Sequence, residues 1–164
     1  MTYAPASLSE LTAYLGTQGV VNLGIVGNTA THCKGYHLGK DRIFGTCACK
    51  PGGICKVGLG AGDFSIASAR DKAGLTTAAS GVDLGRVAGS LTGLRTLTAW
   101  LWAQCKAGAP DTQDIRDVIG SSDGGTVWCW IAGAAGGGTP AFKTNCADAS
   151  HLSHTHISYF RDSE

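Results

Sequence analysis

Two segments carry apolar residues at helical spacing, and residues that start or stop helices bound each of them. The apolar positions are Leu8, Leu11 and Leu15 in the first segment and Leu94, Leu97, Leu101 and Cys105 in the second. Ser7 and Glu10 have the spacing of a capping box, which predicts a helix over residues 7–16. The second segment, residues 91–108, ends in the sequence Gly-Ala-Pro and predicts the longest helix of the chain.

The remaining apolar runs are short and rich in β-branched residues, which predicts strands. Residues 20–27 form one such run, and residues 114–133 predict a hairpin around an Asp-Gly-Gly turn. Residues 155–160 predict a final strand. Residues 29–75 are mostly loop by composition, with a short strand or a turn over residues 63–71. Because helices and strands mix without βαβ alternation, we expect an α+β fold with a small antiparallel sheet, flanked by helices and long Gly- and Cys-rich loops.

Composition and charge limit the classes of protein that fit this chain. Its 164 residues suit a single domain over 1–164, and 43% hydrophobic with 15% charged residues is an ordinary globular composition. A net charge of +1 gives no broad attraction to nucleic acid or to an anionic membrane. The first residues lack the basic start and apolar run of a signal peptide, and no apolar run approaches the ~20 residues that span a bilayer. We therefore expect a monomer that does not insert into membranes.

Seven cysteines leave three interpretations open. Cys33, Cys47, Cys49 and Cys55 are close enough in sequence to hold a structural zinc ion, although the spacing is not the paired C-x2-C of common zinc ribbons. Disulfides are the second interpretation, for a protein that works outside the cell, and inert reduced thiols are the third.

The most unusual feature is a cluster of three of the five histidines at the end of the chain, in the sequence HLSHTHISYF. Because side chains alternate along a strand, we expect His154 and His156 to share one face of the final strand, with imidazoles roughly 7 Å apart. One imidazole can then bind a metal while the other reaches a substrate. The alternative is a polar sheet edge that faces solvent, with two incidental histidines.

A catalytic zinc ion needs three protein ligands and an open position, so two further ligands are required. His37 lies between glycines in GYHLGK, and Asp83 is the carboxylate of the small apolar segment AASGVDLG. A carboxylate in such a segment needs a cation or hydrogen bonds to stay charged. The alternative for Asp83 is the N-cap of a helix that runs through residues 86–88.

The segments GYHLGK, AASGVDLG and HTHIS resemble the metal motifs of the zinc D-Ala-D-Ala carboxypeptidase and L-alanyl-D-glutamate endopeptidase family, which shares its type of metal site with lysostaphin and hedgehog domains. Most of the chain is similar to lysin-like proteins of actinobacterial phages. This resemblance implies that His37, Asp83 and His156 are zinc ligands and that His154 handles protons. It also implies a phage protein made in the host cytoplasm that cuts peptidoglycan at the bacterial cell wall.

Three departures from the family pattern concern the ligand spacing, the general base and substrate binding. The 45 residues 38–82 separate His37 from Asp83, where the family has a short spacer. Ser153 stands where the carboxypeptidases often have a catalytic Glu, so either His154 or another acid such as Asp63 must act as the base. We expect Arg42 or Arg70 to bind a substrate carboxylate, with an ordinary surface position as the alternative.

The order His, Asp, His-x-His and the resemblance therefore favour a zinc-dependent peptidoglycan peptidase. A zinc- and wall-peptide-binding module without activity is the second hypothesis, and a cysteine-stapled binding protein without a catalytic metal is the third. Among the other residues, His32 and His151 are expected in loops. Trp128 and Trp130 share a strand face and are either core residues or the lining of a substrate groove.

Overall fold

A computed structural model describes residues 1–28, 34–44, 63–133, 140–144 and 146–163. Its centre is a six-stranded antiparallel sheet with the strand order β1-β2-β6-β3-β4-β5. The strands are β1 (Val20–Gly24), β2 (Gly81–Val87), β3 (Ile115–Gly120), β4 (Trp128–Ile131), β5 (Ala141–Thr144) and β6 (Thr155–Tyr159). The α-helices are α1 (Ala6–Thr17), α2 (Lys40–Ile43), α3 (Ala69–Ala73) and α4 (Leu91–Ala107). The predicted α+β class is confirmed.

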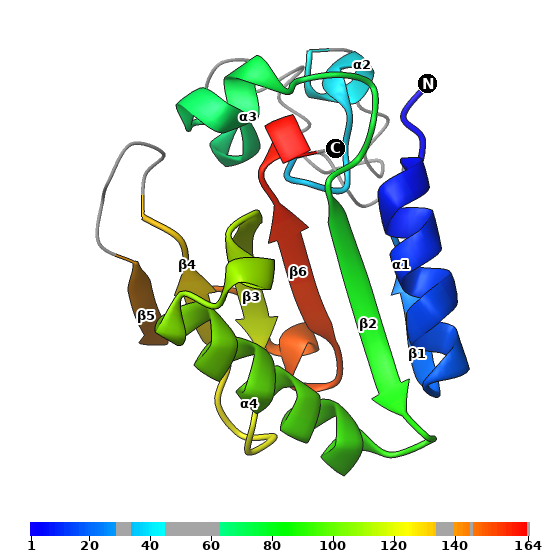
Figure 1. Cartoon of the computed structure of the whole chain (residues 1–164), viewed down its shortest axis with the longest axis vertical. Coiled ribbons are helices and arrows are strands. Elements are labelled where there is room, and N and C mark those ends of the chain that lie inside the picture. The colour runs from blue at the N-terminus through cyan, green and yellow to red at the C-terminus, as the bar shows by residue number, and fades with distance from the viewer. Residues whose placement is uncertain (29–33, 45–62, 134–139, 145, 164) are drawn as a thin grey trace, which may run out of the picture.

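The two long helices cover one face of the sheet (Figure 1). α1 packs on β1, and α4 packs on β2 and β3. Val82 and Leu84 of β2 and Ile157 of β6 point into this core. Because side chains alternate along a strand, their neighbours Asp83 and His156 project from the opposite face. That face carries the candidate site.

The predicted limits of α4 are confirmed, and local interactions explain them. The Ser90 hydroxyl accepts hydrogen bonds from the backbone amides of Thr92 and Gly93, which caps the first turn. Gly108 ends the helix with φ 64°, a left-handed conformation that glycine adopts without steric cost. On the buried side, the Trp102 indole donates to the carbonyl of Val118 at 3.1 Å, which ties α4 to the centre of the sheet.

The predicted hairpin over 114–133 forms β3 and β4, whereas three other predictions need correction. Residues 63–71 are neither strand nor turn: they form a 3-10 helix, Phe64–Ile66, followed by α3. The side chains of Asp63 and Ser68 accept hydrogen bonds from backbone amides and cap these short helices. Asp83 lies in β2, so the alternative of a helix N-cap is wrong. β6 starts at Thr155, so His154 precedes the strand rather than belonging to it.

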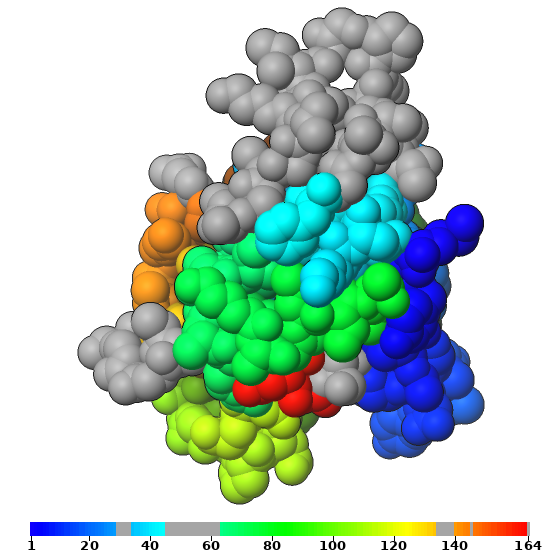
Figure 2. All heavy atoms as spheres, turned by 90° about the horizontal axis from the view of Figure 1, so that it is seen from above, coloured from blue at the N-terminus to red at the C-terminus, as the bar shows by residue number. Residues whose placement is uncertain are grey.

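Arg161 fastens the segments 34–44 and 63–75 to the end of the sheet. Its side chain is only 2% exposed and donates to the carbonyls of Gly35, Leu38, Ser65 and Ala78. Figure 2 looks onto this end of the molecule, where the cyan segment 34–44 lies against the green segment that follows residue 63. Since Gly35 and Leu38 flank His37, this buried guanidinium also fixes a candidate ligand.

Two of the three interpretations of the cysteines apply to the described part of the chain. Cys129 of β4 and Cys146 form a disulfide. Cys105 of α4 is a free, buried thiol, and burial raises its pKa to about 11. The proposed structural zinc site of Cys33, Cys47, Cys49 and Cys55 lies outside the described residues.

Candidate metal centre

Three different segments bring His37, Asp83 and His156 together. Asp83 and His156 are direct cross-strand partners in the β2–β6 pair, so the sheet itself sets their side chains next to each other. His37 follows a turn at Gly35, whose φ of 99° suits glycine. Backbone hydrogen bonds hold this turn between the segment that follows β1 and the start of β2, from the Gly27 amide to the His37 carbonyl and from the Ser80 amide to the Tyr36 carbonyl. The three residues therefore meet at a place that the fold defines closely.

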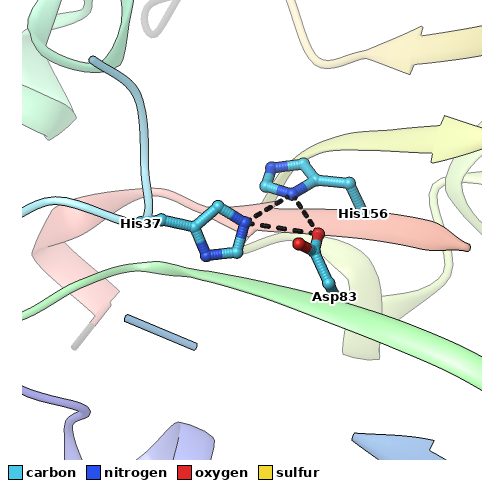
Figure 3. Close-up of side chains that lie close together, drawn as sticks. All are labelled: His37, Asp83 and His156. Carbon is cyan, nitrogen blue, oxygen red and sulfur yellow. Dashed lines mark hydrogen bonds and ion pairs between the residues drawn. The ribbon is translucent and has the colours of Figure 1, made fainter. Parts of the chain in front are cut away.

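The three facing atoms form a small triangle (Figure 3). Nδ1 of His156 lies 2.9 Å from Oδ1 of Asp83 and 3.0 Å from Nε2 of His37, and His37 Nε2 lies 3.2 Å from the same carboxylate oxygen. In a tetrahedral zinc site with metal–ligand distances of ~2.0–2.2 Å, neighbouring ligand atoms are about 3.3 Å apart. The triangle differs from this spacing by a few tenths of an ångström, so the three atoms suit one small divalent cation.

The outer nitrogen of each imidazole is occupied by another group. His37 Nδ1 lies 2.6 Å from the carbonyl oxygen of Ile25, which can only accept a hydrogen bond, so this nitrogen carries the proton. His156 Nε2 lies 2.7 Å from the hydroxyl of Ser158. A second hydrogen bond of this kind fixes the tautomer of a metal-binding histidine. The Ile25 carbonyl thus fixes the tautomer of His37, and the Ser158 hydroxyl, which can accept from Nε2, allows His156 to turn the lone pair of Nδ1 toward an ion beside the carboxylate.

The pKa shifts of Asp83 and His37 show that the triangle favours a bound positive charge. Although burial alone favours the neutral acid, hydrogen bonds from His156 and His37 hold the pKa of Asp83 far below its usual range. Burial also disfavours a charged His37, yet the hydrogen bond and charge of Asp83 raise the pKa of His37 above its ordinary value. The site therefore holds one carboxylate charge and attracts a compensating positive charge, either a proton or a metal ion.

The triangle lies in the wall of a cavity of about 770 Å³. His151 and His154 line the same cavity, as do Lys34, Arg116 and Asp117. His151 belongs to a 3-10 helix, Ala149–Leu152, rather than to a loop, and its ring centre is 4.4 Å from that of His154. Burial and the neighbouring His154 lower the pKa of His151, which favours a neutral imidazole. A peptide segment fits in a cavity of this size.

His154 lies beside the triangle but outside it. Its Nδ1 is 3.0 Å from the carbonyl oxygen of Ser150 and therefore donates to it. Its Nε2 is 3.9 Å from the carboxylate of Asp83 and keeps a lone pair available. This arrangement suits proton transfer at the triangle better than direct binding of the same ion. Asp63, the other candidate base, is 1% exposed and accepts hydrogen bonds from the amides of Ser65 and Gly35.

The arginines at the cavity differ from those that the sequence suggested. Arg70 forms ion pairs with Asp114 at 2.6 Å and with Asp162 at 2.7 Å, and it is not among the residues that line the cavity. Arg42 donates to the carbonyl of Gly27 at 2.7 Å and is also absent from the cavity wall. Arg116 of β3 lines it instead. Nothing in the local sequence pattern singles out this arginine, because its position depends on the pairing of β3 with β6.

Trp128 and Trp130 are core residues and do not line a substrate groove. Trp130 is 5% exposed within the helix-covered core, and Trp128 stacks on Phe142 with a centroid distance of 4.9 Å. Their strand neighbours Cys129 and Ile131 face the other way and line the cavity. His32 lies outside the described residues.

Comparison of the chain with protein-family models, curated proteins and solved structures gives no match. Within the described residues, no helix has the length and apolar character needed to cross a bilayer. The interpretation of the site therefore depends on its own geometry.

Proposed function

We propose that the protein is a zinc-dependent peptidase that hydrolyses an amide bond in the stem peptide of bacterial peptidoglycan. The observation that carries this proposal is the convergence of two imidazole nitrogens and one carboxylate at the wall of a peptide-sized cavity. Two nitrogen donors and one oxygen donor are a common ligand set for catalytic zinc. The motif resemblance in GYHLGK, AASGVDLG and HTHIS supports peptidoglycan as the substrate.

His37, Asp83 and His156 would hold the ion. Bound zinc supplies a Lewis acid that polarises a carbonyl and lowers the pKa of water to about 7. His154 is placed to accept a proton at Nε2, because its Nδ1 is already committed to the Ser150 carbonyl. The same imidazole can then return the proton to the leaving amine. His151 packs against the ring of His154 and helps to hold its orientation.

A specific observation favours the second candidate, a zinc- and wall-peptide-binding module without activity. Ser153, at the position of the family's catalytic Glu, is exposed and donates its hydroxyl hydrogen bond to the Ser150 carbonyl. A serine hydroxyl in this position cannot replace a carboxylate as a base. The two candidates differ only in whether His154 is a sufficient substitute.

Metal content and wall digestion test the proposal together. We expect about one zinc ion per chain in the parent protein, and loss of both zinc and digestion in Asp83→Ala and His156→Ala. His154→Ala should keep its zinc and lose digestion by about 100-fold or more, the usual contribution of a general base. Ser153→Ala is the matched control, since this side chain is exposed and donates to a backbone carbonyl. Digestion is measured as new amino groups released from purified walls.

The outcomes separate the hypotheses. A parent protein that binds zinc and sediments with walls but releases no amino groups would support the binding module. A parent protein without zinc after purification in zinc-containing medium would contradict both, and would leave the cysteine-stapled binding protein.

A further inference from the structure

β3 contains an irregularity that turns two consecutive charged residues toward the cavity. In the pairing with β6, Ile115 is opposite Tyr159 and Asp117 is opposite Ser158, so two steps on β3 match one step on β6. Ile115 and Val118 both lie in the helix-covered core. The residues between them, Arg116 and Asp117, both line the cavity on the other face. This is the geometry of a β-bulge, which redirects side chains and is common beside functional sites.

Asp117 presents a buried oxygen that has no donor within the described part of the chain. The residue is 8% exposed, and its Oδ1 has no hydrogen-bond partner. Nε2 of His156 lies 3.8 Å from this oxygen but is already 2.7 Å from the Ser158 hydroxyl. A buried carboxylate oxygen without a donor is costly. A cationic N–H group of a ligand in the cavity would supply the missing donor.

Arg116 has the complementary feature, a buried donor without an acceptor among the described residues. Its Nε is buried and has no hydrogen-bond partner among the residues that the structure describes, and its Nη1 reaches the Ala132 carbonyl only at 3.5 Å. The Asp71 carboxylate lies 4.0 Å from Nε, but this carboxylate already accepts hydrogen bonds from Tyr36 and Ser68. A guanidinium with donors to spare is the preferred protein partner of a carboxylate.

We propose that Arg116 and Asp117 form a subsite for a ligand group that carries an ammonium and a carboxylate on the same carbon. A ligand with only a positive charge meets the unfavourable charge of Arg116, and one with only a negative charge meets that of Asp117. Both side chains line the same cavity from consecutive positions on β3, so one compact zwitterion can meet both charges. Within a peptide, this group occurs at the free end of a diamino-dicarboxylic acid side chain, and it also occurs in a free amino acid. That the group belongs to a substrate rests on the proposed peptidase function.

A series of small probes tests the subsite by titration calorimetry. The zwitterionic probe is 2,6-diaminoheptanedioic acid with one end acetylated and amidated. Acetyl-lysine amide carries only the ammonium, acetyl-glutamate amide carries only the carboxylate, and free alanine represents a free amino acid. We expect the zinc-loaded protein to bind the zwitterionic side chain about tenfold more tightly than either single-charge probe. Alanine that binds as tightly as this probe would assign the subsite to free amino acids.

Substitutions then assign each charge to its residue. Arg116→Gln should abolish the preference for the zwitterion over acetyl-lysine amide, and Asp117→Asn should abolish the preference for it over acetyl-glutamate amide. Arg116→Lys, which keeps the charge but loses the planar fork, should fall between Arg116→Gln and the parent protein. Arg86→Gln and Asp111→Asn, at exposed positions that do not line the cavity, are the controls.

Equal binding of the single-charge and zwitterionic probes by the parent protein would overturn the subsite, as would no binding of the zwitterion. These outcomes need no variant and so do not depend on whether a variant folds. Because the probes contain no bond between two amino acids, binding is measured apart from hydrolysis. Binding of the zwitterion without wall digestion would support the subsite and contradict the peptidase proposal. Wall digestion without binding of the zwitterion would contradict the subsite and support the peptidase proposal.

Discussion

Gly81→Ala gives the sharpest test of the position of His156. Gly81 lies on β2, opposite Ser158 and on the same face as Asp83. A Cβ atom at this position would be 3.1 Å from Cε1 of His156 and 3.1 Å from Cβ of Tyr36. Ordinary contacts begin at 3.4 Å, so each of the two neighbours must move by the difference, 0.3 Å.

Either movement disturbs the metal centre. The His156 ring is held between Asp83 and Ser158 at 2.9 and 2.7 Å, so a shift lengthens at least one of these contacts. A shift of Tyr36 moves the adjacent His37. Metal–ligand distances tolerate errors of only about 0.2 Å, so we expect zinc affinity to fall about tenfold or more. The overpacking itself should lower the free energy of unfolding of the metal-free protein by about 1–3 kcal/mol.

Gly85→Ala is the matched control, with the same change on the same face of the same strand. Its Cβ would meet Leu23 at 3.1 Å and Val21 at 3.2 Å, and these side chains are 56% and 45% exposed and can move outward. Zinc affinity is measured by competition with a chromogenic chelator, and stability by urea denaturation. If folded Gly81→Ala binds zinc as tightly as Gly85→Ala, His156 is not a ligand in the described orientation.

Three further predictions concern stability. In the metal-free protein, the lowered pKa of Asp83 contributes stability above pH ~4, and this stability is lost as the pH falls. The raised pKa of His37 contributes stability below pH ~6.5, and this stability is lost as the pH rises. Urea midpoints should therefore decline on both sides of this window, and bound zinc should remove the alkaline decline; a flat profile would contradict the coupling of the two groups. Arg161→Met should cost about 3–5 kcal/mol because it leaves several buried carbonyls without donors, and a loss below 1 kcal/mol would show that these hydrogen bonds matter little. The double variant Cys129→Ser and Cys146→Ser opens a cross-link with a sequence separation of 17 residues and should lose about 3 kcal/mol; an unchanged urea midpoint would argue against the disulfide in solution.

Local sequence patterns predicted the elements whose signals are complete within a few residues. The apolar spacing and the Gly-Ala-Pro stop gave the limits of α4, and the Asp-Gly-Gly turn gave the β3–β4 hairpin. Residues 63–71 were missed although Asp63 and Ser68 are good capping residues, because helices of three to five residues have too few apolar positions to show a period.

In the candidate site, too, the sequence predicted some residues and missed others. The residues of the triangle were identified through the motif resemblance, whereas their contact depends on the register of β2 with β6, which no local pattern states. Arg116 and Asp117 could not be placed, because simple alternation would put consecutive strand residues on opposite faces. The bulge that puts both on one face arises from pairing with β6, a strand that lies about 40 residues later in the sequence.

The anchoring of His37 by Arg161 has a consequence for biosynthesis. The turn that carries His37 is translated early, but the guanidinium that holds its two flanking carbonyls is translated more than a hundred residues later. A nascent chain therefore cannot assemble the metal-binding triangle until residue 161 has left the ribosome. Any hydrolytic capacity that the triangle confers must therefore wait for synthesis of the segment that carries His156 and Arg161.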